Sequence, residues 1–449
     1  MPMPLYDTLR SFADSAPLRM HMPGHKGRPL PLAEFSPLAC LDVTELPPTG
    51  NLFEEGGPIQ QAQELWARDF HMEQCLFLTG GSTQGLHTAL ALTARPGDTV
   101  LVDRGCHRCV HHAMALLDLR PVYLSRPWLE GPGVPGPMDP GAVERQLQDH
   151  PDVTTVCITS PTYYGILSDI PELARICHGR GVKLVVDGAH GAHLPFLREY
   201  GNTAADVLVV SAHKTLPAPG QTALLLANGI PMEEIRRKGA VFGSSSPSYV
   251  MMAALDCVRD WMEGDGSAAY RRAAELTAAL RRCTPSLGPE DAPMDPTRYV
   301  LCCRDGRRTE LALQHMDIWP EMADSGHVVC ILTCADGPEE TDRLRAGLEK
   351  LGLLGAPRPA MRLEAPPPAR QVLTPRQALF APVERLPLER ALGRVAGQSV
   401  APYPPGVPVI APGEQVDKKL LAYLDQIGYN DSIALVIPNG EKQPAGAAG

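Results

Sequence analysis

Between residues 75 and 227, short apolar, β-rich runs alternate with stretches in which apolar residues recur at helical spacing. The runs are apolar almost throughout, which is typical of strands covered on both faces. This alternation predicts an α/β fold with a mostly parallel sheet and helices on both sides. Because ligands bind at the carboxyl ends of such strands, we expect the functional residues there. The candidate strands are residues 75–78, 100–103, 121–124, 155–159, 183–187, 207–211 and 223–227.

The whole chain is predicted to comprise four segments. Residues 1–50 form an N-terminal arm, and 51–250 form the large domain. Residues 251–355 form a small α/β domain, helical over 250–282 and with strand-like runs at 299–303 and 327–333. Residues 356–449 begin in a proline-rich crossover, form a small terminal unit and end in a tail that should be frayed. The Pro- and Gly-rich residues 131–140 are predicted to be a loop.

Composition limits the class of protein. The 449 residues carry a net charge of −10 with scattered basic residues, which argues against a nucleic-acid surface. No apolar run approaches the ~20 residues of a membrane-spanning helix, and residues 1–20 do not resemble a secretory signal. The twelve cysteines mostly lie singly, as expected for reduced thiols. We therefore expect a soluble cytoplasmic protein with neither nucleic-acid nor membrane partners.

Cys106 and Cys109 are the exception, because two cysteines at this spacing can begin a zinc or redox site. A structural zinc site needs a second ligand pair, and no comparable Cys-x-x-Cys recurs in the sequence. We therefore predict no metal.

A glycine-rich turn follows the strand at 75–78. Gly80 and Gly81 permit a tight turn, and Ser82 and Thr83 can cap the helix that follows. Free N–H groups and hydroxyls at a helix start form a phosphate cradle. An ordinary capped turn would look the same, so this motif alone favours phosphate only slightly.

Two further strands end in groups suited to one ligand. Asp187 ends an apolar strand and is followed by His190; a solvated turn acid is the alternative. Lys214 follows another strand, where partial desolvation would favour the neutral nucleophile. Alone, Lys214 could be an ordinary surface lysine, but Ser211 and His213 flank it as further phosphate donors.

His107 follows the strand at 100–103, where it could stack on a flat aromatic ligand or simply cap a helix. A phosphate cradle, a strand-ending acid and a lysine 27 residues later together match the needs of pyridoxal 5′-phosphate (PLP). The lysine holds the PLP aldehyde, the acid keeps the pyridine nitrogen protonated, and the helix start takes the phosphate.

With these residues in place, the chain resembles the ornithine/lysine/arginine decarboxylases. These are PLP enzymes of the aspartate-aminotransferase fold (fold type I), and the likeness is to the short bacterial form. The most specific matches are HMPGHKG at 21–27, SAHK at 211–214 and PYPPG at 402–406. Other matches are DVTEL at 42–46, residues 80–87 and 106–112, PTYYG at 161–165, DGAHGAH at 187–193, SSPSY at 245–249 and PGE at 412–414.

The resemblance implies a role for each candidate residue. Lys214 would bind the cofactor covalently, Asp187 would face its pyridine nitrogen, His107 would stack on its ring, and His190 would lie near that ring. Phosphate contacts would come from Gly81, Ser82, Thr83, Ser211 and His213. The serine-rich loop at 244–248 resembles one that approaches the neighbouring subunit's cofactor, which implies a homodimer or a larger homo-oligomer.

The resemblance implies decarboxylation of arginine, lysine or ornithine to an amine of the kind that polyamine metabolism uses. His107, His190 and Lys214 are the candidate proton donors to the α-carbon. Glu45, Glu54, Glu55 and Asp324 are candidate acids for the substrate's cationic side chain. Another PLP lyase or aminotransferase, or a PLP-binding protein without turnover, stays open as an alternative.

Three positions depart from the family pattern. Gly188 stands where an acid usually follows the pyridine-binding Asp, Cys109 replaces a serine, and Gly220 replaces a serine or threonine. None removes the lysine, the acid or the phosphate cradle, so they bear on substrate identity and activity rather than on cofactor binding.

Overall fold

The computed structural model describes residues 2–28, 37–197, 200–360, 364–401 and 408–438. The PYPPG segment at 402–406 and the C-terminal tail named above lie outside these residues. In the described part of the chain, no helix is long and apolar enough to cross a membrane.

A seven-stranded sheet in the order β1-β9-β8-β7-β6-β2-β3 forms the centre of the molecule. All of the predicted strands are present, with ends shifted by at most two residues. The sheet is mostly parallel, as predicted, but β9 runs antiparallel to both β1 and β8. The connection from β8 to β9, residues 211–222, contains only the four-residue helix α7, and the chain turns back instead of crossing over the sheet. The strands are β1 (Gln74–Leu78), β2 (Thr99–Asp103), β3 (Arg120–Leu124), β6 (Val153–Thr159), β7 (Lys183–Asp187), β8 (Val207–Val210) and β9 (Ala223–Ala227).

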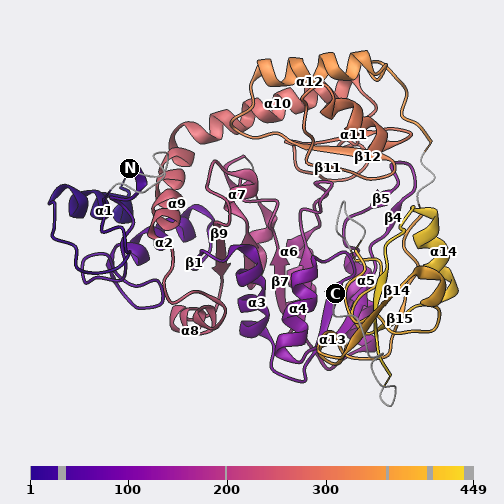
Figure 1. Cartoon of the computed structure of the whole chain (residues 1–449), viewed down its shortest axis with the longest axis horizontal. Helices are drawn as coiled ribbons and strands as arrows, with labels where there is room; N and C mark the ends of the chain where they lie inside the picture. The colour runs from indigo at the N-terminus through magenta and orange to yellow at the C-terminus, as the bar shows by residue number, and fades with distance from the viewer. Residues whose placement is uncertain (1, 29–36, 198–199, 361–363, 402–407, 439–449) are drawn as a thin grey trace, which may run out of the picture.

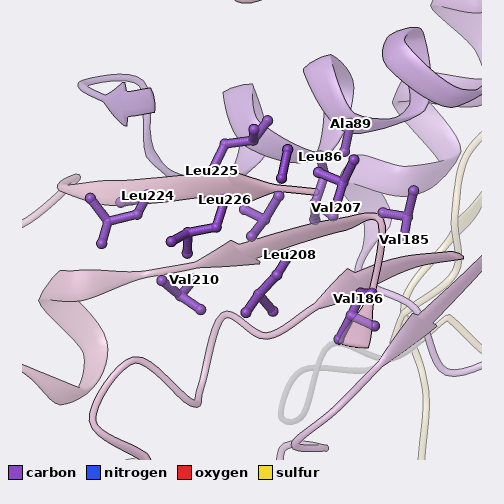
Figure 2. Packing of buried hydrophobic residues seen from close by; sticks show 14 of the residues in the cluster. Leu86, Ala89, Val185, Val186, Val207, Leu208, Val210, Leu224, Leu225 and Leu226 are labelled. Carbon is purple, nitrogen blue, oxygen red and sulfur yellow. The ribbon is translucent and has the colours of Figure 1, made fainter. Parts of the chain in front are cut away.

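Helix α3 (Gly81–Thr93) lies closely against this sheet. Figure 2 shows Leu86 and Ala89 of α3 beside the strand residues Val185 and Val207. A side chain at Gly85 would come within 2.6 Å of Val209, so glycine allows the helix to approach the strand. This packing places the first turn of α3 beside the carboxyl end of β8.

Further helices surround the sheet, and α1 packs against α2 and α9 at the N-terminal side (Figure 1). One prediction is partly wrong. The Pro- and Gly-rich residues 131–140 contain a short strand, β5, because Val134 is buried and pairs with Leu129 of β4. The elements are α1 (Pro4–Asp14), α2 (Gly57–Asp69), α4 (Arg108–Leu117), β4 (Trp128–Leu129), β5 (Val134–Pro135), α5 (Pro140–Asp149), α6 (Ile170–His178), η2 (Leu194–Phe196), η3 (Gly201–Ala204), α7 (Ala212–Thr215), α8 (Met232–Phe242) and α9 (Tyr249–Trp261).

The predicted helical stretch at 250–282 leads out of the large sheet. It consists of α9, the π-helical turn η4 (Met262–Gly266) and α10 (Ser267–Cys283). Beyond it lies a small antiparallel sheet in the order β10-β12-β11 with its own apolar core (Figure 1). The elements are β10 (Arg298–Cys302), α11 (Gly306–Gln314), β11 (Met322–Ala323), β12 (His327–Ile331) and α12 (Pro338–Lys350).

The C-terminal unit has a separate core around Ile410, Leu420 and Leu435. Arg376 donates to the carbonyl oxygen of Ala115, which attaches this unit to the C-terminal end of α4. The domain limits at residues 50, 250 and 355 stay predictions. The elements are β13 (Arg370–Gln371), α13 (Pro375–Leu379), β14 (Val383–Leu386), η5 (Leu388–Arg390), β15 (Glu414–Gln415), α14 (Lys418–Gln426) and β16 (Ile433–Val436).

Candidate active site

Asp187 and Lys214 lie at the carboxyl ends of neighbouring parallel strands. Asp187 is the last residue of β7, and Lys214 lies in α7, directly after β8. The Asp187 side chain is buried, and one carboxylate oxygen accepts a hydrogen bond from Ala189 N at 3.1 Å. Burial raises the pKa of Asp187, while the charge of Lys214 and the Ala189 N–H partly offset that rise. The structure therefore places a buried acid within electrostatic reach of a half-buried amine.

The amine of Lys214 faces His190. The Lys214 Nζ lies 3.2 Å from His190 Nε2, and the lysine side chain is half-buried. Burial lowers the pKa of Lys214; Asp187 and Glu321 oppose this effect, and Arg298 adds to it. The net direction is down, which favours the unprotonated amine.

His190 is buried between aromatic and cationic neighbours. Its ring lies 4.8 Å from the Tyr163 ring, centroid to centroid, and its Nδ1 lies 3.4 Å from Arg298 Nη2. Burial, followed by the charges of Lys214 and Arg298, lowers the pKa of His190 well below its usual value. The imidazole is therefore neutral at physiological pH.

The predicted phosphate contacts gather at the start of α3 and of α7. Gly81 has a φ of +71°, Ser82 is half-buried and Thr83 is exposed. The hydroxyl of Ser211 is buried without a hydrogen-bond partner. His213 Nδ1 lies 2.9 Å from the carbonyl oxygen of Thr222, which occupies one of its two ring nitrogens.

His107 caps helix α4: its Nδ1 accepts a hydrogen bond from Cys109 N at 3.3 Å. The side chain keeps an exposed surface. Even so, desolvation by the surrounding protein, followed by the charge of Lys214, lowers the pKa of His107 to about 4. The structure thus places a neutral imidazole within the electrostatic influence of Lys214.

These residues fit PLP. An unpartnered buried hydroxyl at Ser211 needs an acceptor, which a phosphate oxygen supplies. The thirteen-residue helix α3 directs its free N–H groups to the same region. A buried acid suits a protonated ring nitrogen, and a half-buried lysine suits an aldehyde carbon.

Three residues near Lys214 were not expected as site residues. Tyr163 belongs to the matched PTYYG segment, but nothing in that match indicated a role for it. Its hydroxyl donates to Glu321 Oε1 at 2.5 Å. Arg298 and Glu321 come from the small sheet, and no local pattern in the sequence distinguishes them from the chain's other charged residues.

Of the four candidate acids for the substrate's cationic side chain, Asp324 already has several hydrogen-bond partners within the protein. It accepts hydrogen bonds from Tyr164 Oη at 2.6 Å and from the backbone N of Gly326 and His327. Glu45 accepts a hydrogen bond from the Thr44 hydroxyl. The remaining candidates, Glu54 and Glu55, are exposed.

Cys106 and Cys109 are both buried, and burial raises the pKa of each thiol. Cys106 Sγ lies 3.7 Å from His111 Nε2, and Cys109 shares a hydrogen bond with Thr83. Within the described residues, no three His, Cys, Asp or Glu side chains are placed to hold a metal ion.

Of the three departures from the family pattern, only Gly188 is explained by packing. A side chain at Gly188 would meet Leu208 at 2.7 Å and Tyr200 Oη at 3.2 Å, so these neighbours occupy the space that an acid would need. Cys109 keeps a polar contact through Thr83. Gly220 has no atom within 4 Å of an added Cβ, so glycine is not required there by packing.

A lysine and a buried acid at adjacent strand ends of such a sheet define a PLP-dependent enzyme of fold type I. The chain belongs to the Orn/Lys/Arg decarboxylase family: the model of the family's major domain matches residues 3–284, and that of its C-terminal domain matches residues 364–432. It is thus one of the PLP-dependent amino-acid decarboxylases.

Two relatives of similar length support this family assignment, and a solved structure has the same fold. An uncharacterized protein of Bacillus subtilis is 30% identical over 95% of this chain and 94% of its own length. An arginine decarboxylase of Bacillus anthracis is 27% identical over 94% of this chain and 92% of its own. The crystal structure of a Francisella novicida lysine decarboxylase has a TM-score of 0.82 at 19% identity and covers 97% of this chain and 81% of that one.

Proposed function

We propose that this chain decarboxylates a basic amino acid, arginine first among the candidates, with PLP bound to Lys214. The observation that carries the proposal is the position of the Lys214 amine, 3.2 Å from His190 and beside the buried Asp187. When bound, PLP supplies an electron sink for the carbanion left at the α-carbon by loss of carbon dioxide.

The chain's own residues prepare that chemistry. Asp187 would hold a proton on the ring nitrogen of bound PLP, and His107 would lie against its ring. Gly81, Ser82, Thr83, Ser211 and His213 would bind the phosphate. His107, His190 and Lys214 remain the candidates for returning a proton to the α-carbon. They lie close enough that the charge of Lys214 lowers the pKa of both histidines.

Arginine is favoured because relatives that align over almost their whole length are named arginine decarboxylases. A basic side chain also needs an anion near the reaction site, and Glu321 is suited to that role. Its carboxylate is exposed and accepts a hydrogen bond from Tyr163, whose ring lies against His190. A cavity of about 280 Å³, lined in part by Trp319, Glu321 and Asp336, opens beside it.

The test is a substrate panel with the purified protein and PLP. Arginine, lysine, ornithine and the uncharged norleucine are supplied separately, and released carbon dioxide is measured. We expect release with arginine and none with norleucine. Transfer of the amino group to a keto acid without release of carbon dioxide would instead identify an aminotransferase. Capture of PLP without formation of any product would identify a binding protein without turnover.

Glu321→Gln tests the side-chain assignment. Loss of one charge-assisted contact should lower kcat/KM for arginine about 10- to 100-fold, mainly through KM. Glu339→Gln, an exposed acid at the start of α12 in the same small unit, is the matched control and should leave kcat/KM unchanged. Equal values for Glu321→Gln and the parent protein would contradict the assignment.

The proposal includes a homodimer in the cytoplasm whose amine product serves polyamine metabolism. Ser244, Ser245 and Ser246 are exposed, as a loop that meets a neighbouring subunit would be in a single chain. Light scattering during gel filtration gives the mass directly. A monomer that is fully active would contradict the dimer.

A further inference from the structure

Arg298 is a buried guanidinium beside the candidate active site. As the first residue of β10, it is fully buried, and its Nη1 donates to the carbonyl oxygen of Tyr163 at 3.2 Å. Asp295 lies 4.0 Å away as a partial counter-ion, and Arg298 Nε has no hydrogen-bond partner. Because no part of the side chain is exposed, Arg298 can act on the site only through its neighbours.

The neighbour through which Arg298 can act is His190. Arg298 Nη2 lies 3.4 Å from His190 Nδ1, and the opposite ring nitrogen, Nε2, lies 3.2 Å from Lys214 Nζ. A guanidinium can only donate hydrogen bonds, so Nδ1 must be the acceptor and carries no proton. A neutral imidazole bears one proton, which therefore sits on Nε2.

An Nε2–H group directed at Lys214 needs an acceptor on the lysine. An ammonium group has three donors and no acceptor, so one of its hydrogens would point at the Nε2–H and no hydrogen bond could form. Only the unprotonated amine offers a lone pair to this donor. The hydrogen bond in this geometry thus exists for the neutral lysine alone.

We propose that Arg298 is a positioning residue: by occupying Nδ1 it fixes His190 in the Nε2–H tautomer and so holds Lys214 as a neutral amine. This inference rests on the proposed function, in which Lys214 is the nucleophile toward PLP.

Other groups around Lys214 act in both directions. The carboxylates of Asp187 and Glu321 favour its charged form, whereas burial and the positive charge of Arg298 disfavour it. Other titratable groups that face the pair of His190 and Lys214 are His107, Cys109, His213 and Tyr163, whose ring lies 4.8 Å from that of His190. Since the carboxylates oppose the neutral amine, a hydrogen bond that only the amine can accept adds to the effect of burial.

Two variants separate the tautomer from the charge. Arg298→Gln and Arg298→Met both remove the positive charge, but only glutamine can still donate to His190 Nδ1. Arg281→Met is the matched control, because Arg281 donates to the carbonyl oxygens of Asp295 and Arg298 and makes no hydrogen bond to His190.

The first measurement is ¹⁵N spectroscopy of histidine in the full chain after removal of the cofactor, with the His190 signals assigned from a His190→Asn variant. We expect a protonated Nε2 and an unprotonated Nδ1 in the parent protein, in Arg298→Gln and in Arg281→Met. In Arg298→Met a substantial Nδ1–H population should appear. An Nδ1–H tautomer in the parent protein would overturn the proposal, even if no variant folds.

The second measurement is the pH midpoint for covalent capture of added PLP by Lys214, trapped with borohydride. Arg298→Met should have a midpoint about 1 pH unit above that of Arg298→Gln. Equal midpoints in these two variants would overturn the proposal. If the parent protein captures no PLP at any pH, the proposed function fails, while the ¹⁵N spectrum still decides the tautomer.

Discussion

At Lys214 one amino group is exposed to opposing influences. Burial and Arg298 favour the neutral amine, and Asp187 and Glu321 favour the ammonium ion. The balance is downward in pKa, which suits a nucleophile. Since the side chain is half-buried and its amine contacts the His190 ring nitrogen, loss of the Lys214 side chain should cost little stability.

Lys214→Ala should therefore fold normally but lose the borohydride-reducible bond to PLP, and decarboxylation should fall by about 10³-fold or more. Mass spectrometry after reduction locates the modified residue. Lys183→Ala, which removes a lysine paired with Asp206 at 2.7 Å, is the control and should retain the modification. A reducible cofactor bond in Lys214→Ala would show that another lysine carries PLP.

Asp187 is the second residue whose environment sets its chemistry. Asp187→Asn keeps the shape of the side chain but removes the anion that would hold a proton on the cofactor ring. We expect retained PLP and a decrease in kcat on the order of 10²- to 10⁴-fold. Absorbance of the bound cofactor and steady-state rates separate the two effects, and an unchanged kcat would refute the role.

At the scale of elements, the strands of the large sheet could be predicted well, because buried strands are apolar along their whole length. The strand order and the reversed β9 could not, because pairing partners are far apart in sequence. The same limit applies to the site. Asp187 ends its strand and Lys214 comes just after its own, whereas Arg298 reaches His190 only through the fold of the small sheet.

The loop after β6 joins the large sheet to the small one. Tyr163 and Tyr164 donate to Glu321 and Asp324, and Asp295 N donates to the carbonyl oxygen of Gly165 at 2.8 Å. Gly165 has a φ of +84°, and a Cβ there would lie 2.7 Å from Arg298 Cβ and Cγ. Glycine therefore allows the close approach that seats Arg298 beside His190.

Gly165→Ala should destabilise the protein by about 2–4 kcal/mol, because it combines an unfavourable φ with a collision against a buried side chain. The measurement is the midpoint of thermal unfolding, which should fall by about 5 °C or more. Gly220→Ala, with open space around the added methyl and no positive φ, is the control. A midpoint equal to that of the control would show that Arg298 moves aside freely.

At the scale of the whole molecule, buried polar contacts hold the units together. Arg104, beyond β2, donates to Glu414 of the C-terminal unit at 2.8 Å. His327 joins the small sheet to the segment between β4 and β5, since its Nε2 lies 2.7 Å from the carbonyl oxygen of Pro132. Its Nδ1 lies 3.0 Å from Asp324, and the His327 side chain is fully buried.

The pair of His327 and Asp324 should make stability depend on pH. Burial alone would lower the pKa of His327, but the hydrogen bonds to Asp324 and Cys302 and the charge of Asp324 outweigh it and raise the pKa to about 10. The histidine pKa is about 6.5 in the unfolded chain. The imidazolium thus stabilises the fold fully below about pH 6.5, and this contribution is lost as the pH rises through about 10. For Asp324, whose pKa is lowered, stability is lost as the pH falls through that pKa.

His327→Gln should cost about 3 kcal/mol at neutral pH, because it leaves the Asp324 carboxylate without its buried cation. Thermal unfolding measured from pH 6.5 to 10 should show a falling midpoint in the parent protein and a flatter profile in the variant. His178→Gln is the matched control: His178 also pairs with an acid, Asp206 at 2.8 Å, but is 48% exposed, so its loss should cost less than about 1 kcal/mol. Parallel profiles for the parent protein and His327→Gln would mean that His327 is neutral in the fold and that Asp324 draws its stabilisation from Tyr164 and the backbone instead.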